Sequence, residues 1–352
     1  MPEVHTVPMP APTADAGPKR LPPVFRITDL IRWPAPDGCS VHNEAELFHE
    51  QAGLHVVWVT ASVDSRLQVG TLVSIRWLGK PVSIDGALRI RRLVLQERVI
   101  PALNLFETVP SHWVKDREWV KRASVLWDQL SRPFQQLFNA VFWDPHRFRR
   151  YLVGPSSING HHSGVNGNFQ HAVEVAEQSL ALASVQASPS VLIAAGLLHD
   201  AGKADEYRLN PNRPGFVLSE RGLLVGHRHT VLEWLAVARA TERIILPEAQ
   251  YLALLHTLTA AKGVEWLGIR EPMSLEATIL AAADRLSGLN HLVGRLAPEA
   301  GPGFGRYPTS QNGRPDVVAG HDVPSGVTGE APILSTRAVR LTGYPISERG
   351  PL

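Results

Sequence analysis

The octapeptide GLLHDAGK, residues 196–203, ends an apolar run on a histidine and an aspartate that are adjacent in sequence. Upstream, Ser188 is suited to an N-cap and Pro189 to the first helical position, so we predict a helix that ends at His199 and Asp200. The residues between are almost all apolar, which indicates a buried helix. A buried carboxylate without a partner is costly, so the pair predicts a compensating group at the helix end.

Four further segments combine helical apolar spacing with one polar residue on the inward face. One such histidine alone would be explained as a hydrogen-bonded core residue, but two carboxylates that converge with several imidazoles require a partner. Neutral imidazoles and ionised carboxylates are ligands of divalent metal ions. The sequence therefore predicts helices that converge on a metal site. The expected inward residues are His171, His199, Asp200, His227, His256 and Asp284.

The order of these residues resembles a known signature. His171, the pair His199-Asp200 and Asp284 reproduce the H…HD…D pattern of the HD superfamily of metal-dependent phosphohydrolases. The resemblance implies an all-α HD domain, and His227 and His256 match positions that supply a second metal in binuclear members. One or two divalent ions are therefore expected. Mn²⁺ is the first choice, with Fe, Co, Ni, Zn or Mg as alternatives, because such sites accept several metals.

The segment 24–105 has strand character. It contains β-branched runs such as LHVVWVTASV and ALRIRRLVLQ, separated by turn-forming residues, which predicts a small OB-like barrel. The expected fold class is therefore α+β multidomain, with the barrel followed by the HD domain. We expect Trp58 and Trp77 to stack on bases and Arg89 and Arg91 to contact phosphates. The alternative is that the tryptophans are core residues and the arginines form a solvated face.

The remaining segments and the composition complete the expected organisation. The expected divisions are a disordered leader at 1–23, a helical linker at 106–150, the HD domain at 151–297 and a mostly disordered tail at 298–352. The chain has 352 residues and a formal charge of +2, so any nucleic-acid surface must be a local patch. Cys39 is the single cysteine, and no stretch approaches a membrane span or a signal peptide, so a cytoplasmic protein is expected.

Two narrower families resemble larger parts of the chain. The order of barrel, linker and HD domain, together with the stretch PSSINGHHSGVNGNFQHAVEVAE at 155–177, resembles the YhaM family of 3′-to-5′ exoribonucleases. The same stretch is similar to the MobH group of HD-type relaxases. The chain departs from the exonuclease pattern at Gly167-Asn168-Phe169, where two glycines and a leucine are usual. It also has Thr257 after His256, where a second histidine is frequent.

The resemblance implies a mechanism with named roles. Asp200 is expected to bridge two ions, and Lys203 is expected to contact a non-bridging phosphoryl oxygen. The alternative for Lys203 is a cation that stabilises a helix end. His161 and His162 are expected to contact substrate at the mouth of the site, or else to form an exposed pair in a turn.

The expected function is a metal-dependent phosphodiesterase, a 3′-to-5′ exonuclease on single-stranded RNA or DNA. The expected partner is a single strand of nucleic acid, without a membrane, and the sequence leaves open whether the chain forms a homo-oligomer. Three alternatives remain: a MobH-like relaxase or conjugation-associated protein, an HD nucleotide phosphohydrolase, and a non-catalytic nucleic-acid-binding protein with a structural metal. An OB-like barrel favours a polymer, because an enzyme for small molecules would not need one.

Overall fold

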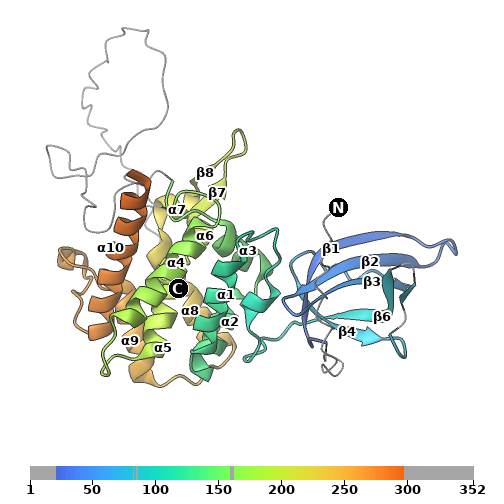
Figure 1. The fold of residues 1–352 in the computed structure, drawn as a ribbon, viewed down its shortest axis with the longest axis horizontal. Coiled ribbons are helices and arrows are strands. Elements are labelled where there is room, and N and C mark those ends of the chain that lie inside the picture. Colours follow the sequence, from blue (N-terminus) through green and yellow to red (C-terminus); the bar gives the residue numbers. More distant parts are fainter. Residues whose placement is uncertain (1–20, 82, 85, 159–161, 297–352) are drawn as a thin grey trace, which may run out of the picture. The chain divides into compact units, whose positions relative to one another are not determined.

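The computed structural model describes residues 21–81, 83–84, 86–158 and 162–296 (Figure 1). The expected leader and tail lie almost entirely outside these residues. Strands fill the first part of the described chain. They are β1 (Phe25–Pro34), β2 (Val41–His49), β3 (Ala52–Thr60), β4 (Leu72–Trp77), β5 (Ser83–Ile84) and β6 (Ala87–Leu95).

Five of these strands close a barrel. Their order is β1-β2-β3-β6-β4, and β4 pairs back onto β1. The β3–β6 pair is parallel and the other neighbours are antiparallel, while the short β5 pairs only with β6. Inward residues alternate along each strand, with Ala45 and Leu47 on β2 and Val56 on β3 among those in the core. This topology confirms the predicted OB-like barrel.

The barrel's tryptophans correct one expectation. Trp58 follows Val56 at the period of two and is only 4% exposed, so its ring fills the barrel core and is not available for a base. Trp77 is partly buried and packs against the same core. Arg89 and Arg91 are exposed, as a phosphate-contacting role requires.

Helices fill the second part of the described chain (Figure 1). They are η1 (Leu105–Thr108), α1 (Arg117–Asp128), α2 (Arg132–Phe142), α3 (Pro145–Val153), α4 (Gly167–Ala181), α5 (Pro189–Leu198), α6 (Lys203–Glu206), α7 (Glu220–Leu224), α8 (His227–Thr241), α9 (Glu248–Thr259), η2 (Glu265–Leu267) and α10 (Leu275–Leu296). Among the described helices, none is long and apolar enough to cross a membrane. The part is not purely helical, because β7 (Tyr207–Leu209) and β8 (Phe216–Leu218) form a hairpin. The segment between these strands, NPNRPG, is rich in turn-forming residues.

The segment expected to be a linker contributes to the same core as the helices that follow it. Phe106 stacks on Phe169 of α4 at 5.8 Å between ring centroids, and Phe142 of α2 lies 4.6 Å from Tyr151 of α3. Helix α3 begins with a side-chain cap, since Asp144 accepts from the backbone N–H groups of His146 and Arg147. Helices α1 to α3 therefore form one hydrophobic cluster with α4 and α5.

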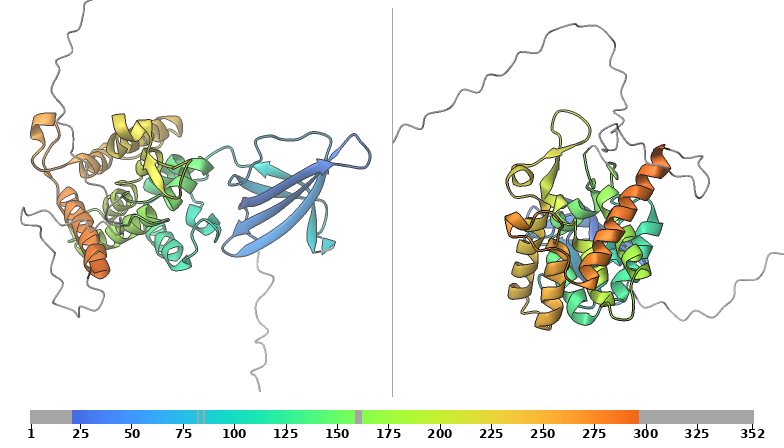
Figure 2. Two further views of the ribbon diagram at one scale, coloured as in Figure 1. Left: turned by 90° about the horizontal axis from the view of Figure 1, so that it is seen from above. Right: turned by 90° about the vertical axis from the view of Figure 1, so that its left-hand side faces the viewer.

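Two helix contacts position His199 and Asp200, the polar residues that follow α5. A Cβ at Gly196 would lie 2.5 Å from the Cα of Ala176, so only a glycine lets α5 lie this close to α4. Helix α10 also packs along α4 and contacts α5 (Figures 1 and 2). The end of α5 therefore meets the inward faces of α4 and α10.

One buried cation joins the strand and helical segments. The guanidinium of Arg26 on β1 donates to the backbone oxygen and the hydroxyl of Thr108 and to the backbone oxygen of Gly70. It also lies over the rings of Trp113 and Phe148, at 5.1 and 5.2 Å from their centroids. Burial lowers the pKa of Arg26 to about 9.

Candidate metal centre

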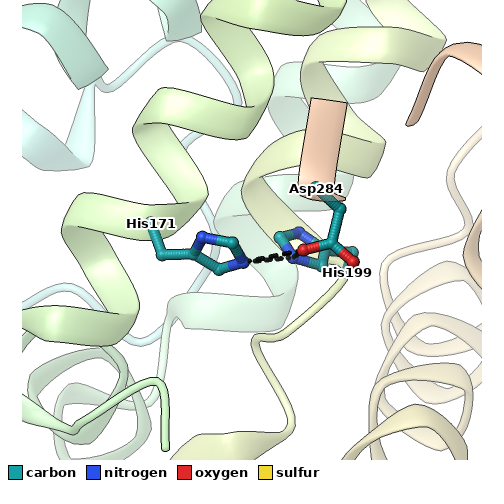
Figure 3. Close-up of side chains that lie close together, drawn as sticks. All are labelled: His171, His199 and Asp284. Carbon is teal, nitrogen blue, oxygen red and sulfur yellow. Dashed lines mark hydrogen bonds and ion pairs between the residues drawn. The ribbon is translucent and has the colours of Figure 1, made fainter. Parts of the chain in front are cut away.

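Three predicted ligands come together from three helical segments (Figure 3). His171 lies on α4, His199 is the residue after α5, and Asp284 lies on α10. The Nε2 atoms of the two rings are 3.2 Å apart, and Asp284 Oδ1 is 3.0 Å from His171 Nε2 and 3.8 Å from His199 Nε2. Each residue offers a ligand atom within 4.8 Å of the others. The histidines are buried, whereas the Asp284 side chain is 46% exposed and gives the site an open side.

The other nitrogen of each ring is engaged by the protein. His199 Nδ1 donates to the backbone oxygen of Gly196 at 2.8 Å. Ser287 Oγ lies 3.0 Å from His171 Nδ1 and donates its own proton to Glu174 at 2.6 Å, so its oxygen must accept from the ring. Both rings therefore carry a proton on Nδ1 and direct Nε2 at the site, which is the arrangement found at metal-ligating histidines.

Asp200 extends this group toward a third histidine. Its Oδ2 lies 3.6 Å from His171 Nε2 and 3.5 Å from His199 Nε2, whereas its Oδ1 lies 3.4 Å from His227 Nε2. The two oxygens of one carboxylate thus face two histidine groups. This is the placement expected of a bridging ligand.

Lys203 is a further neighbour of Asp200, after the three histidines. Its Nζ donates to Asp200 Oδ2 at 2.5 Å and to Ser156 Oγ at 3.4 Å, and its side chain is mostly buried. Burial by itself would raise the pKa of Asp200, but Lys203 and the three histidines lower it more, so the net pKa lies well below the ordinary value. Asp200 is therefore ionised at neutral pH.

The neighbouring groups have matching charge states. Burial would raise the pKa of Asp284, but the neighbouring His171 and His199 together outweigh this and lower the pKa to about 2. Burial lowers the pKa of His199, which favours the neutral ring. Neutral imidazoles and ionised carboxylates are the donor set of a divalent transition metal. These residues therefore fit such an ion.

His227 has a carboxylate behind it. Its Nδ1 is 2.6 Å from Glu206 Oε2, and the same oxygen accepts from the His227 backbone N–H at 2.8 Å. Burial would raise the pKa of Glu206, but its side-chain and backbone contacts with His227, together with the nearby Lys203, lower the pKa on balance. The Nε2 of His227 is thereby directed at Asp200.

Two other predicted residues, His256 and His162, have contacts that differ from the expected ones. His256 Nε2 accepts the backbone N–H of Met273 at 2.9 Å, and among the described residues the compact ligand group does not include it. His162 is only 5% exposed and lies behind His171, with its Nε2 at 3.3 Å from Glu174 and its ring centroid at 5.5 Å from that of His171. The expectation that His162 contacts substrate at the mouth is therefore wrong, because its ring packs behind a ligand. His161 lies outside the described residues.

Sequence reasoning missed three residues that support the ligands. They are Glu174, Glu206 and Ser287. A signal was present, because each lies three positions after a predicted site residue, one helical turn away on the same face. Glu174 follows His171 in this way and Ser287 follows Asp284.

Comparison with known families agrees with this geometry. Residues 168–289 match the family model described as HD domain. The matched segment runs from α4 into α10 and contains all six predicted ligands. The helical part thus carries an HD domain, the domain of a superfamily of metal-dependent phosphohydrolases. No solved structure matches the chain significantly.

Proposed function

We propose that the protein is a metal-dependent phosphodiesterase that shortens single-stranded RNA or DNA from the 3′ end. The observation that carries the proposal is the position of Asp200, whose two oxygens face His171 and His199 on one side and His227 on the other. A single structural ion would not require ligands on both sides of one carboxylate. Mn²⁺ is the metal we expect, in one or two copies.

The chain's own residues divide the work at this centre. His171, His199 and Asp284 would hold one divalent ion, and His227 would hold a second with Asp200 shared between them. Bound divalent ions supply positive charge that activates water and neutralises phosphoryl oxygens. Lys203 has three N–H donors and uses two of them on Asp200 and Ser156, so the third can bind a non-bridging phosphoryl oxygen. The open side at Asp284 admits the substrate.

The barrel supports a polymer as substrate. Trp33 on β1 and His42 on β2 are register partners whose rings stack with centroids 5.7 Å apart and planes 6° apart. Trp33 is 41% exposed, so this pair offers the aromatic surface that Trp58 does not. The exposed Arg89 on β6 pairs in register with Val57 on β3, and β3 in turn pairs with β2, so this cation lies two strands away from the aromatic pair. We propose that this face, with Arg91, holds the strand.

The test is digestion of a 5′-labelled single strand, with RNA and DNA in parallel, in the presence of Mn²⁺ or a chelator. We expect a ladder of products shortened from the 3′ end, absent with chelator and in Asp200→Asn. Asp205→Asn is the matched control, because that aspartate binds Arg150 instead of the metal centre. Its products should equal those of the wild type.

The other outcomes identify the alternatives. A single internal cut would indicate a relaxase-like activity, and hydrolysis confined to free nucleotides would indicate a nucleotide phosphohydrolase. Strand binding without any shortening would contradict the proposal and indicate a binding protein with a structural metal.

A further inference from the structure

We propose that Glu206 and Glu174 are positioning residues that fix the two histidine groups on opposite sides of Asp200 independently of each other. The inference rests on the proposed function in one respect, that the centre takes divalent ions. Among the described residues, neither glutamate belongs to the compact ligand group. Glu206 contacts the proposed ligand His227, and Glu174 contacts Ser287, whose hydroxyl is bonded to His171.

Glu206 holds His227 at two points. One oxygen of the Glu206 carboxylate accepts both the ring Nδ1–H and the backbone N–H of His227, at 2.6 and 2.8 Å. The ring is therefore held in one orientation at the start of α8. The surrounding backbone leaves little room for adjustment. A Cβ at Gly202 would lie 2.1 Å from the His227 backbone oxygen, and one at Gly222 would lie 2.5 Å from that of Glu206. The position of Glu206 is therefore set by packing and is transmitted to His227.

Glu174 holds His171 through a relay. Its Oε2 accepts the hydroxyl proton of Ser287 at 2.6 Å, and the Ser287 oxygen accepts Nδ1–H of His171. The same carboxylate oxygen lies 3.3 Å from His162 Nε2. This carboxylate thus joins α4 to α10 behind the first ligand and keeps the ring in one orientation.

The geometry at Asp200 keeps the two supports apart. Its Oδ1 faces the histidine that Glu206 holds, and its Oδ2 faces the histidine that Glu174 holds. A carboxylate behind a metal-ligating imidazole orients the ring and strengthens it as a donor, and its loss typically weakens metal binding about 10- to 100-fold. Each glutamate should therefore affect the ion on its own side.

The experiment measures Mn²⁺ binding to the full chain by calorimetry and the visible spectrum of the Co²⁺ form. Glutamine keeps the shape of glutamate and an acceptor oxygen but removes the charge. We expect Glu206→Gln and Glu174→Gln each to weaken one binding event about 10- to 100-fold and to change the Co²⁺ spectrum, while circular dichroism stays that of the wild type. Ser287→Ala should weaken the same event as Glu174→Gln, and combining the two should add little.

Two glutamates on α4 and α8, the helices that carry His171 and His227, serve as matched controls. Glu177 on α4 binds Arg122, and Glu233 on α8 binds Arg221, both away from the metal centre. Glu177→Gln and Glu233→Gln should bind Mn²⁺ as the wild type does. Equal weakening in these controls would overturn the inference, because the effect would then follow from charge alone.

The remaining outcomes separate this inference from the proposed function. Wild-type Mn²⁺ affinity and Co²⁺ spectrum in both test variants would overturn the positioning roles and leave the phosphodiesterase standing. Weakening of the same event by both would overturn their independence, and loss of the folded state in either would show a structural role instead. A wild-type chain that binds no divalent ion would overturn both the inference and the function.

Discussion

At the residue scale, Asp200 is the carboxylate around which the titratable groups of the candidate metal centre gather. One buried carboxylate is surrounded by Lys203 and the imidazoles of His171, His199 and His227. The ion pair with Lys203 compensates part of the desolvation that burial imposes on the carboxylate. An apolar residue of similar size at position 200 would leave these four neighbours without the carboxylate that they contact.

Acid should weaken the fold through this residue. The pKa of Asp200 in the folded protein lies below its unfolded value, so its ionised form stabilises the fold above the unfolded pKa of about 3.9. That contribution is lost as the pH falls from there toward the folded pKa. We expect the free energy of unfolding of the chelator-treated wild type to fall below about pH 4, and that of Asp200→Asn to fall less. Urea denaturation at pH 7, 5, 4 and 3 measures both. If the free energy of unfolding of the wild type and of Asp200→Asn fell equally with pH, Asp200 would not be the source of the acid sensitivity.

Lys203 should act on turnover and not on metal binding. Lys203→Ala removes a donor for the phosphoryl group but no ligand, so we expect kcat on an oligonucleotide to fall roughly 10²- to 10³-fold. Calorimetry should give the wild-type affinity for Mn²⁺. A matching loss of Mn²⁺ affinity would instead assign Lys203 to the maintenance of Asp200.

At the element scale, the contact of α5 with α4 decides where the HD pair lies. The backbone of Gly196 approaches the backbone of Ala176 in α4, and this contact fixes the end of α5 against α4. The Gly196 carbonyl also accepts from His199. One glycine therefore sets both the spacing of the helices and the orientation of a ligand.

A methyl group added at Gly196 should disturb both the spacing of α4 and α5 and the orientation of His199. Gly196→Ala would place a Cβ 2.5 Å from Ala176, and overpacking of this kind costs about 1–3 kcal/mol of stability. The helices must separate, so Mn²⁺ binding should weaken as well. Gly164→Ala is the control, because no atom lies within 4 Å of its added Cβ. Thermal melting and calorimetry measure the two effects, and unchanged Mn²⁺ affinity in Gly196→Ala would contradict the link.

Some features of these elements could be predicted from the sequence and others could not. The end of α5 was predictable, because Ser188 and Pro189 begin the helix and the apolar run leads directly to His199. The inward direction of Trp58 was not, because the run LHVVWVT is apolar on both faces and its alternation is ambiguous. His162 lies among glycines and polar residues that favour an exposed turn. Its burial depends on Glu174, a contact that no local pattern reveals.

At the scale of the whole molecule, the strand-forming segment and the helical segment depend on one another through Arg26. Its guanidinium is fully buried and binds neutral acceptors from both, with no carboxylate among its hydrogen-bond partners in the described residues. Arg26→Leu would leave the carbonyls of Thr108 and Gly70 without donors, at a cost on the order of 3 kcal/mol. A lower urea midpoint is expected, and an unchanged midpoint would contradict this role. Arg66→Leu, which removes an exposed arginine, is the control.

If the barrel binds the strand and the helical part hydrolyses it, a change in the barrel should affect polymer substrates but not small ones. Trp33→Ala should weaken binding of a single-stranded oligonucleotide by about 1–3 kcal/mol, the usual value of one stacked base, and leave hydrolysis of a small phosphodiester unchanged. Trp266→Ala is a matched control, because that tryptophan is 80% exposed and lies outside the barrel. Fluorescence anisotropy and a colorimetric assay separate the two readouts. Equal loss on both substrates would contradict a strand-binding face.

The relay from Ser287 to Glu174 spans 113 positions of the chain. During synthesis, a nascent chain exposes His171 and His199 long before Asp284 and Ser287 have left the ribosome. The ion position proposed at His171, His199 and Asp284 therefore gains its last ligand only when α10 is made, so binding of a metal ion there at full affinity requires the completed helical segment. In a cell, loading with metal would follow translation and could not guide it.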